Sequence, residues 1–156
     1  MHNYFVRHIF TVLECSVISI IYFLHFRAKE VRNFIKGFYL TFFALCLIIL
    51  LFNKGYNEPD NILSSYEACL FIILSLYFLY KEIKERSVPR LNEYYFFWLN
   101  SAILVYFGIS FFVFLFSVLL EKSDLKIYNF FKAFSLMVNI TYNILLTVSI
   151  WKIRKN

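Results

Sequence analysis

The sequence predicts an all-α protein, a polytopic bundle of five transmembrane helices, and two observations lead to this class. Hydrophobic residues make up 61% of the 156 residues and the mean hydropathy is +0.66, whereas soluble proteins average roughly 45–50% apolar residues. The apolar residues also gather in five long runs, separated by charged or turn-forming segments. A chain of this length therefore has room for a single transmembrane domain, residues 1–156, with short connections between spans.

Residues 94–120 form the longest apolar run and contain no charged side chain. At about 1.5 Å per residue, a helix of this length covers roughly 40 Å, which exceeds the roughly 30 Å of hydrocarbon in a bilayer. We predict the other four spans over residues 5–26, 34–52, 62–80 and 127–151. The first is expected to be a retained helix, not a signal peptide, because Glu14 interrupts the apolar run and no small-residue cleavage site follows.

The segments that connect the predicted spans are either basic or rich in turn-forming residues. A basic loop precedes the second span, which is the most purely apolar segment and is expected to face lipid. Residues 53–61 form a turn-rich loop. The third helix is predicted to continue through residues 81–86, where oppositely charged residues four apart can pair, until Pro89 ends it. Both prolines lie in loops, so all five helices are expected to be continuous.

The distribution of lysine and arginine predicts that the N-terminus lies outside and the C-terminus inside. In this orientation eleven basic residues are cytoplasmic and five are external, in agreement with the positive-inside rule. The eleven are Arg27, Lys29, Arg32, Lys36, Lys81, Lys84, Arg86, Arg90, Lys152, Arg154 and Lys155, and the five are Arg7, Lys54, Lys122, Lys126 and Lys132. The net charge of +6 is thus explained by topology, and no nucleic-acid partner is expected.

Polar side chains inside the spans define the candidate site. A charge within a span costs about 2.5 kcal/mol or more, so such groups are expected to face the bundle interior. Glu14 and Glu67 both fall in the predicted outer half of the membrane, and a one-face stripe on the last helix adds Ser135, Asn139, Asn143 and Thr147. We predict an outward-opening polar pocket formed by Glu14, Glu67, Tyr106, Ser110, Asn139 and Asn143, with Arg7 and Lys132 at its mouth.

Three interpretations of this pocket remain open. Its groups can hold the bundle together by hydrogen bonds between helices, at about 1 kcal/mol per bond. They can form a sensory or ligand site, in which the carboxylates meet a cationic group or titrate with external pH. They can also line an ion or proton path, although the cytoplasmic half of the spans contains no acid.

The residues do not favour an enzyme, a metal or a cofactor. No paired acids lie near a histidine, and no serine has an evident histidine or lysine partner. His8 and His25 fall near opposite ends of one helix, so they cannot ligate one metal together. The three cysteines, at positions 15, 46 and 69, lie inside apolar runs without metal spacing and are interpreted as buried thiols.

Short motifs carry a resemblance to a known group of proteins. They are the run from Phe96 to Gly108, the T-V-L-E segment at 11–14, Glu67 at the opening of an apolar helix, and the asparagine-rich last helix around Asn139. In these the chain resembles a family of small uncharacterised membrane proteins typical of Bacteroidota, often associated with sensor histidine kinase systems. The resemblance implies a role in signalling. Similar proteins carry two further helices before the T-V-L-E segment, so the resemblance implies that the chain is either the last five of seven spans or a shortened form.

The functional hypothesis is a non-enzymatic membrane sensor or signalling accessory of the bacterial inner (plasma) membrane. External stimuli would act at Glu14, Glu67 and Asn139, and a membrane or cytoplasmic signalling protein would contact a cytoplasmic partner surface. We place that surface at Lys81, Lys84, Arg86 and Arg90, together with the tail at 152–156. The alternatives are a small transporter or channel subunit and a purely structural assembly subunit. No helix face of small residues stands out as a dimer interface. The sequence therefore leaves open whether the chain forms homo-oligomers.

Overall fold

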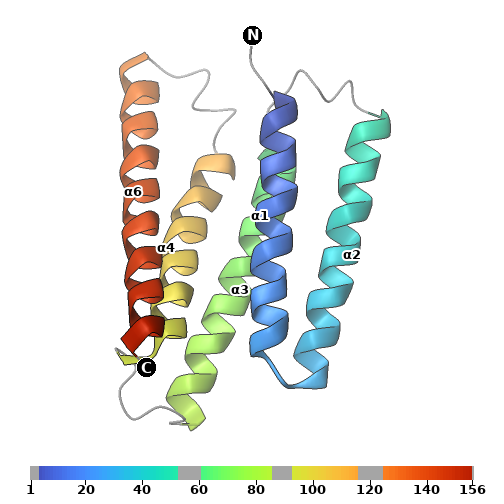
Figure 1. Cartoon of the computed structure of the whole chain (residues 1–156). Coiled ribbons are helices and arrows are strands. Elements are labelled where there is room, and N and C mark those ends of the chain that lie inside the picture. The colour runs from blue at the N-terminus through green and yellow to red at the C-terminus, as the bar shows by residue number, and fades with distance from the viewer. Residues whose placement is uncertain (1–3, 53–60, 86–92, 116–124, 156) are drawn as a thin grey trace. The chain divides into compact units, whose positions relative to one another are not determined.

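Five long α-helices make up the computed structural model, which describes residues 4–52, 61–85, 93–115 and 125–155 (Figure 1). The helices are α1 (Tyr4–His25), α2 (Lys29–Phe52), α3 (Asn61–Glu85), α4 (Tyr95–Leu115) and α6 (Leu125–Lys155). The described residues contain no strand, which confirms the predicted all-α class. All five helices are long and apolar enough to cross a membrane, so the chain is a multi-pass membrane protein.

Each predicted span overlaps one of these helices, although residues 116–120 of the fourth span lie outside the described residues, and α2 shows one informative difference. This helix begins at Lys29, whereas the predicted span began at residue 34. Nothing in the segment breaks a helix, and Glu30 lies in the first turn, where a negative charge is favourable. The backbone N–H of Arg32 donates to the Ala28 carbonyl at 3.1 Å and closes that turn. The basic residues after Ala28 therefore lie on the helix, and only three residues connect α1 to α2.

The chain divides into two compact units, Met1–Glu67 and Ala68–Asn156, and each is described by itself. In the first unit α1 packs against α2, and α2 contacts the beginning of α3. The Tyr66 ring stacks on Phe38, with centroids 4.3 Å apart. The Thr41 hydroxyl donates to the Phe38 carbonyl at 2.8 Å, so the Tyr66 hydroxyl is the donor in its 2.7 Å bond to Thr41. Hydroxyl groups therefore tie α2 to α3.

The core of the second unit is aromatic and lies between α3 and α4. Phe71 and Phe107 have ring centroids 4.9 Å apart, and those of Phe78 and Phe96 are 5.0 Å apart. All four side chains are at most 2% exposed. Fully buried Asn100 adds one polar link, because its amide nitrogen donates to the Ser75 carbonyl at 3.3 Å. Aromatic packing and the hydrogen bond of Asn100 therefore hold α3 and α4 together.

α4 and α6 run antiparallel along each other in the second unit. The Ser149 hydroxyl, near the end of α6, donates to the carbonyl of Tyr95 at the start of α4, at 3.0 Å. Further along the pair, Tyr106 stacks on Tyr142 with centroids 4.6 Å apart. This packing places Trp98 and Trp151 at the same end of the helix pair.

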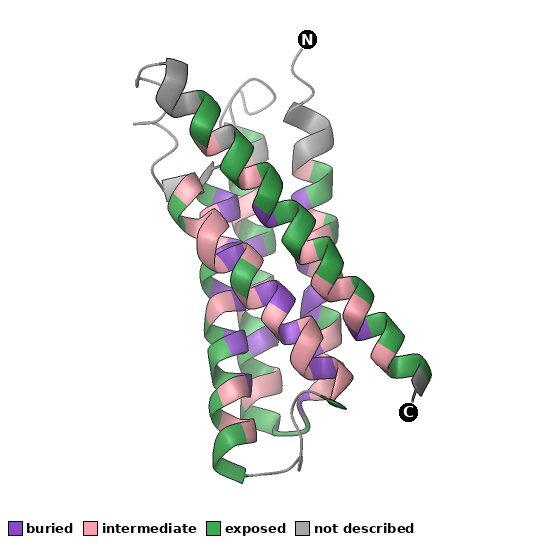
Figure 2. Cartoon of the chain, turned by 90° about the vertical axis from the view of Figure 1, so that its left-hand side faces the viewer, coloured by how far each residue is buried: buried purple, intermediate pink, exposed green. Residues whose placement is uncertain are grey.

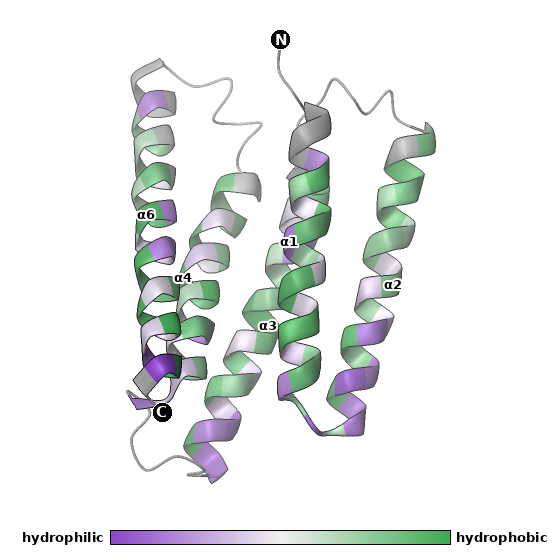
Figure 3. Ribbon diagram, viewed as in Figure 1, coloured by the Kyte–Doolittle hydropathy of each residue, from purple (hydrophilic) through white to green (hydrophobic). Residues whose placement is uncertain are grey.

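α3 is the most buried span and α2 is among the least buried. Half of the α3 window is buried, against 11% for α2, which fits the prediction that the second span faces lipid. α3 also continues past its apolar part to Glu85, as predicted, and Lys81 and Glu85 form an ion pair at 3.9 Å. Figure 3 shows hydrophilic residues gathered at this end of α3. The predicted Glu82/Arg86 pair lies partly outside the described residues.

Tyr94 precedes α4 and is expected to titrate late. Burial raises its pKa to about 12, and charges on Tyr95 and Glu82 contribute, against about 10 for an ordinary tyrosine. Since folding favours the neutral phenol, the contribution of Tyr94 to stability is complete below about pH 10 and is lost as the pH rises towards 12. Tyrosinate absorbance is measured against pH for the wild-type chain and for Tyr94→Phe. The difference between the two curves reports Tyr94 and should rise near pH 12. A rise near pH 10 would contradict this prediction.

Candidate functional site

A buried carboxyl near a buried thiol is the most unusual feature of the first unit. Glu67 on α3 is 2% exposed and Cys15 on α1 is fully buried. Cys15 lies within electrostatic range of Glu67, Cys46 and Glu14. We call these four residues the acid–thiol cluster. Cys15 is thus a neighbour of both acids, of Glu14 beside it in the chain and of Glu67 on α3.

The pattern of α1 explains why Cys15 points inward. Thr11, Cys15, Ile18 and Tyr22 are buried and recur at intervals of three or four residues, the spacing of one helix face. Glu14 is only half-buried, because it lies at the edge of this face. Glu67 lies on a corresponding face of α3. Two amphipathic faces that each carry a polar group therefore position the cluster.

The thiols of this chain differ in their surroundings. Cys15 is buried, as predicted, but Cys46 is half-buried and Cys69 is exposed. The prediction that all three are buried was therefore wrong for Cys69, because position 69 falls on the outer face of α3, between the buried positions 68 and 70. Among the described residues, no group of three or more His, Cys, Asp or Glu side chains could hold a metal ion.

Most of α6 is exposed (Figure 2), and three of the four residues of the predicted polar stripe are among its exposed positions. We call Ser135, Asn139, Asn143 and Thr147 the α6 polar stripe. The Asn143 amide nitrogen donates to both the backbone carbonyl and the side-chain oxygen of Asn139, each at 2.8 Å. The Ser135 and Thr147 hydroxyls donate to backbone carbonyls one turn earlier. The stripe is therefore satisfied mainly within its own helix.

Two polar atoms of the α6 polar stripe can still form hydrogen bonds. Within the described part of the chain, the amide nitrogen of Asn139 and the amide oxygen of Asn143 have no further hydrogen bond. Both side chains are exposed. An exposed asparagine is unfavourable in lipid, because hydrocarbon offers neither donor nor acceptor. The stripe is therefore suited to bind a polar group of another helix.

The remaining predicted pocket residues lie on α4. Tyr106 is half-buried through its stack on Tyr142, and Ser110 is half-buried one turn further along. Both belong to the second unit with Asn139 and Asn143, whereas Glu14 and Glu67 belong to the first. The pocket that combines the two sets stays a prediction. The side chains of Arg7 and Lys132 lie outside the described residues.

The predicted cytoplasmic partner surface is described in part. Lys81 is half-exposed and pairs with Glu85, and the amine of exposed Lys84 lies 5.5 Å from the centre of the Tyr80 ring. Arg86 and Arg90 lie outside the described residues. The described portion is thus the charged last turn and a half of α3, in which Lys84 and Glu85 are exposed.

Sequence reasoning did not single out Cys15 as a neighbour of Glu67, or the facing pair Ser16 and Tyr39. The Ser16 hydroxyl donates to the Val12 carbonyl at 2.6 Å, so the Tyr39 hydroxyl is the donor in the 2.9 Å bond between α1 and α2. The four-residue recurrence of Thr11, Cys15 and Ser19 within an apolar run was the available signal. No known protein-family model, curated protein or solved structure matches the chain.

Proposed function

We propose that this multi-pass membrane protein is a membrane sensor or signalling accessory that reads an external stimulus near Glu67. The observation that carries the proposal is the continuity of α3, which holds a buried carboxyl near one end and an exposed charged segment at the other. From Glu67 to Glu85 the helix spans about 27 Å, close to the thickness of a bilayer core. A shift of α3 on one side of the membrane would therefore move charges on the other.

The surroundings of Glu67 support its role as the input. A carboxyl group within a span is costly, and such groups mark functional sites by default. Glu67 lies near Cys15, which also lies near Glu14. A cationic ligand or a proton that reached this cluster would change its net charge, and with it the packing of α3 against α1.

The α6 polar stripe supports an output through a partner in the membrane. Its outward amide groups can hydrogen-bond to a transmembrane helix of a signalling protein, at about 1 kcal/mol per bond. The N-out, C-in orientation given by the basic residues would place the charged end of α3 in the cytoplasm, beside such a partner. The resemblance to Bacteroidota membrane proteins associated with sensor histidine kinases supports the same role and an inner-membrane location.

The experiment that tests the proposal is a mild-detergent pull-down from native membranes with a tag on the C-terminus, read by mass spectrometry. The wild-type chain should retain a signalling protein in stoichiometric amounts. The double variant Asn139→Leu/Asn143→Leu should reduce its recovery about 25-fold, if each lost hydrogen bond costs about 1 kcal/mol. Ile140→Leu, at an exposed apolar position of the same helix, should leave recovery unchanged.

The second arm of this experiment replaces the buried acid. Glu67→Gln keeps the shape of the side chain and should leave the partner bound while abolishing its response to external pH or ligand. A bound partner whose response is unchanged would indicate a structural assembly subunit instead. A chain that binds nothing but shows Glu67-dependent solute flux in proteoliposomes would indicate a transporter or channel subunit.

A further inference from the structure

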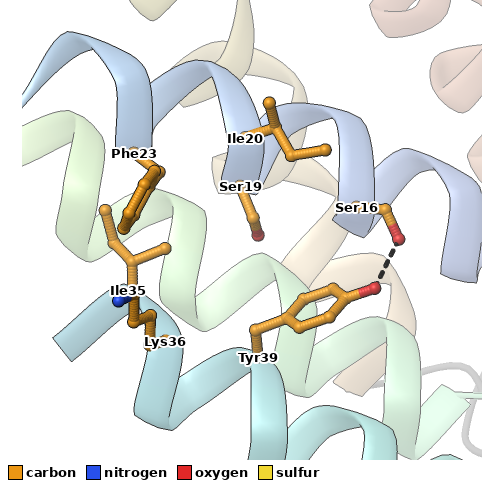
Figure 4. A pocket seen from close by; sticks show the side chains of 7 residues that line it. All are labelled: Ser16, Ser19, Ile20, Phe23, Ile35, Lys36 and Tyr39. Atoms are coloured by element: carbon orange, nitrogen blue, oxygen red, sulfur yellow. Dashed lines mark hydrogen bonds between the residues drawn. The ribbon is translucent and has the colours of Figure 1, made fainter. Parts of the chain in front are cut away.

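A pocket lies between α1 and α2 at the end of the helices where the short connection joins them (Figure 4). Its volume is about 270 Å³, and it opens on one side to the surroundings. Ile20 and Phe23 of α1 and Ile35 of α2 supply apolar walls. A pocket of this shape between two membrane helices suits a flexible apolar chain, since lipid already surrounds both helices.

Two cations lie at the end of the pocket that is nearest the connection. Lys36 lines the pocket, and Arg32 lies one turn before it on the same face of α2. The Arg32 guanidinium lies 4.0 Å from the centre of the Phe23 ring, and the Lys36 amine lies 5.4 Å from the same centre. Neither cation pairs with a carboxylate of the described residues. The Phe23 ring, which lines the pocket, is thus in contact with two positive charges.

The other end of the pocket is polar and closed. The bond between Tyr39 and Ser16 bridges the two helices there (Figure 4). Ser19 lies between this bridge and the cations, and its hydroxyl is buried without a hydrogen-bond partner in the described chain, apart from a weak interaction with the Cys15 thiol. A buried hydroxyl within the pocket offers a donor to a ligand oxygen.

We propose that this pocket binds one lipid molecule with an anionic headgroup. The negative headgroup lies on Lys36 and Arg32, an ester oxygen accepts from the Ser19 hydroxyl, and an acyl chain packs on Ile20, Phe23 and Ile35. Charge complementarity favours this occupant over a neutral one, since the connection and first turns of α2 carry Arg27, Lys29, Arg32 and Lys36 against Glu30 alone. Such basic clusters beside a span attract anionic lipid. The site does not depend on the proposed sensor role.

Photo-crosslinking of the full chain in phosphatidylcholine vesicles tests this assignment. The probe is phosphatidylglycerol with a diazirine in its acyl chain, and the labelled peptides are identified by mass spectrometry. We expect labelling of α1 and α2 at the pocket, and little labelling there by the phosphatidylcholine analogue. Arg32→Gln/Lys36→Gln should reduce labelling about 25-fold, or about fivefold per charge removed.

Lys84→Gln is the matched control, because Lys84 is also an exposed lysine whose amine lies 5.5 Å from the centre of an aromatic ring, but it does not line the pocket. It should leave labelling of α1 and α2 unchanged. Equal labelling by the phosphatidylcholine probe, or equal losses in the two charge variants, would overturn the proposal. Inorganic phosphate should not compete with the probe; competition would mean that the cations bind free phosphate and not a lipid.

A second pair of variants tests the apolar part of the pocket. Ile20 lines it and Val17 does not, and the two side chains are similarly exposed, at 57% and 55%. Ile20→Trp fills the pocket and should abolish labelling, whereas Val17→Trp should preserve it. Because both positions are exposed, neither change disturbs the core. Labelling that survives Ile20→Trp would place the lipid elsewhere and overturn the proposal.

Discussion

Phe107→Ala should lower the free energy of unfolding by about 2–3 kcal/mol. The Phe107 side chain is 2% exposed, and its ring centroid lies 4.9 Å from that of fully buried Phe71. In water-soluble cores a Phe→Ala change costs about 3–5 kcal/mol, as the sum of a transfer term and a cavity term. In a bilayer the transfer term largely disappears, since lipid is as apolar as the protein interior. The cavity term remains and sets the expected loss.

Reversible unfolding in bicelles or nanodiscs would measure this loss. Phe112→Ala is the control, because Phe112 lies on the same helix and is 60% exposed. It should change the free energy of unfolding by less than about 0.5 kcal/mol. Equal losses for the two variants would mean that aromatic residues on α4 stabilise the chain by partitioning into the membrane and not by packing against α3.

Asn100→Asp should cost about 2.5–3.5 kcal/mol, the usual cost of a carboxylate at the centre of a span. The Asn100 side chain is fully buried, and its amide nitrogen donates to the Ser75 carbonyl at 3.3 Å. A carboxylate oxygen at that place would face the carbonyl oxygen, so an attraction between α3 and α4 would become a repulsion. The same unfolding measurement would detect the loss.

Asn100→Leu separates the charge from the lost hydrogen bond. It removes the hydrogen bond to the Ser75 carbonyl, which is worth about 1 kcal/mol, without adding a charge, and it keeps a side chain of similar size. We expect the leucine variant to be clearly more stable than the aspartate variant. If the two were equally destabilised, the hydrogen bond to Ser75 would account for the whole effect and the buried charge would contribute nothing.

Some features of this protein followed from local patterns. The apolar runs located the five helices, because each run is long enough to cross a bilayer and few helix breakers interrupt it. The four-residue spacing of Lys81 and Glu85 predicted their pairing and the extension of α3 beyond its apolar part. The α6 polar stripe was likewise visible as a repeat of four, since helix geometry alone determines which residues share a face.

Other features depended on which faces meet, and periodicity does not reveal that. Sequence reasoning placed Asn139 and Asn143 on one face of the last helix, but it did not reveal that in α6 both side chains are exposed and bond to each other. The beginning of α2 was placed five residues too late, because a cluster of basic residues was interpreted as a loop although it favours no break in the helix.

The sequence by itself determined the class of this protein, the number of its helices and the polar positions within them, because these depend on hydrophobicity and on the period of a helix. Only the tertiary structure decided which polar groups become neighbours. It placed Cys15 near Glu67, Tyr39 against Ser16, and Lys36 with Arg32 over the Phe23 ring. These pairings depend on the register and rotation of one helix against another, which follow from side-chain packing across the interface and leave no regular trace in a single sequence.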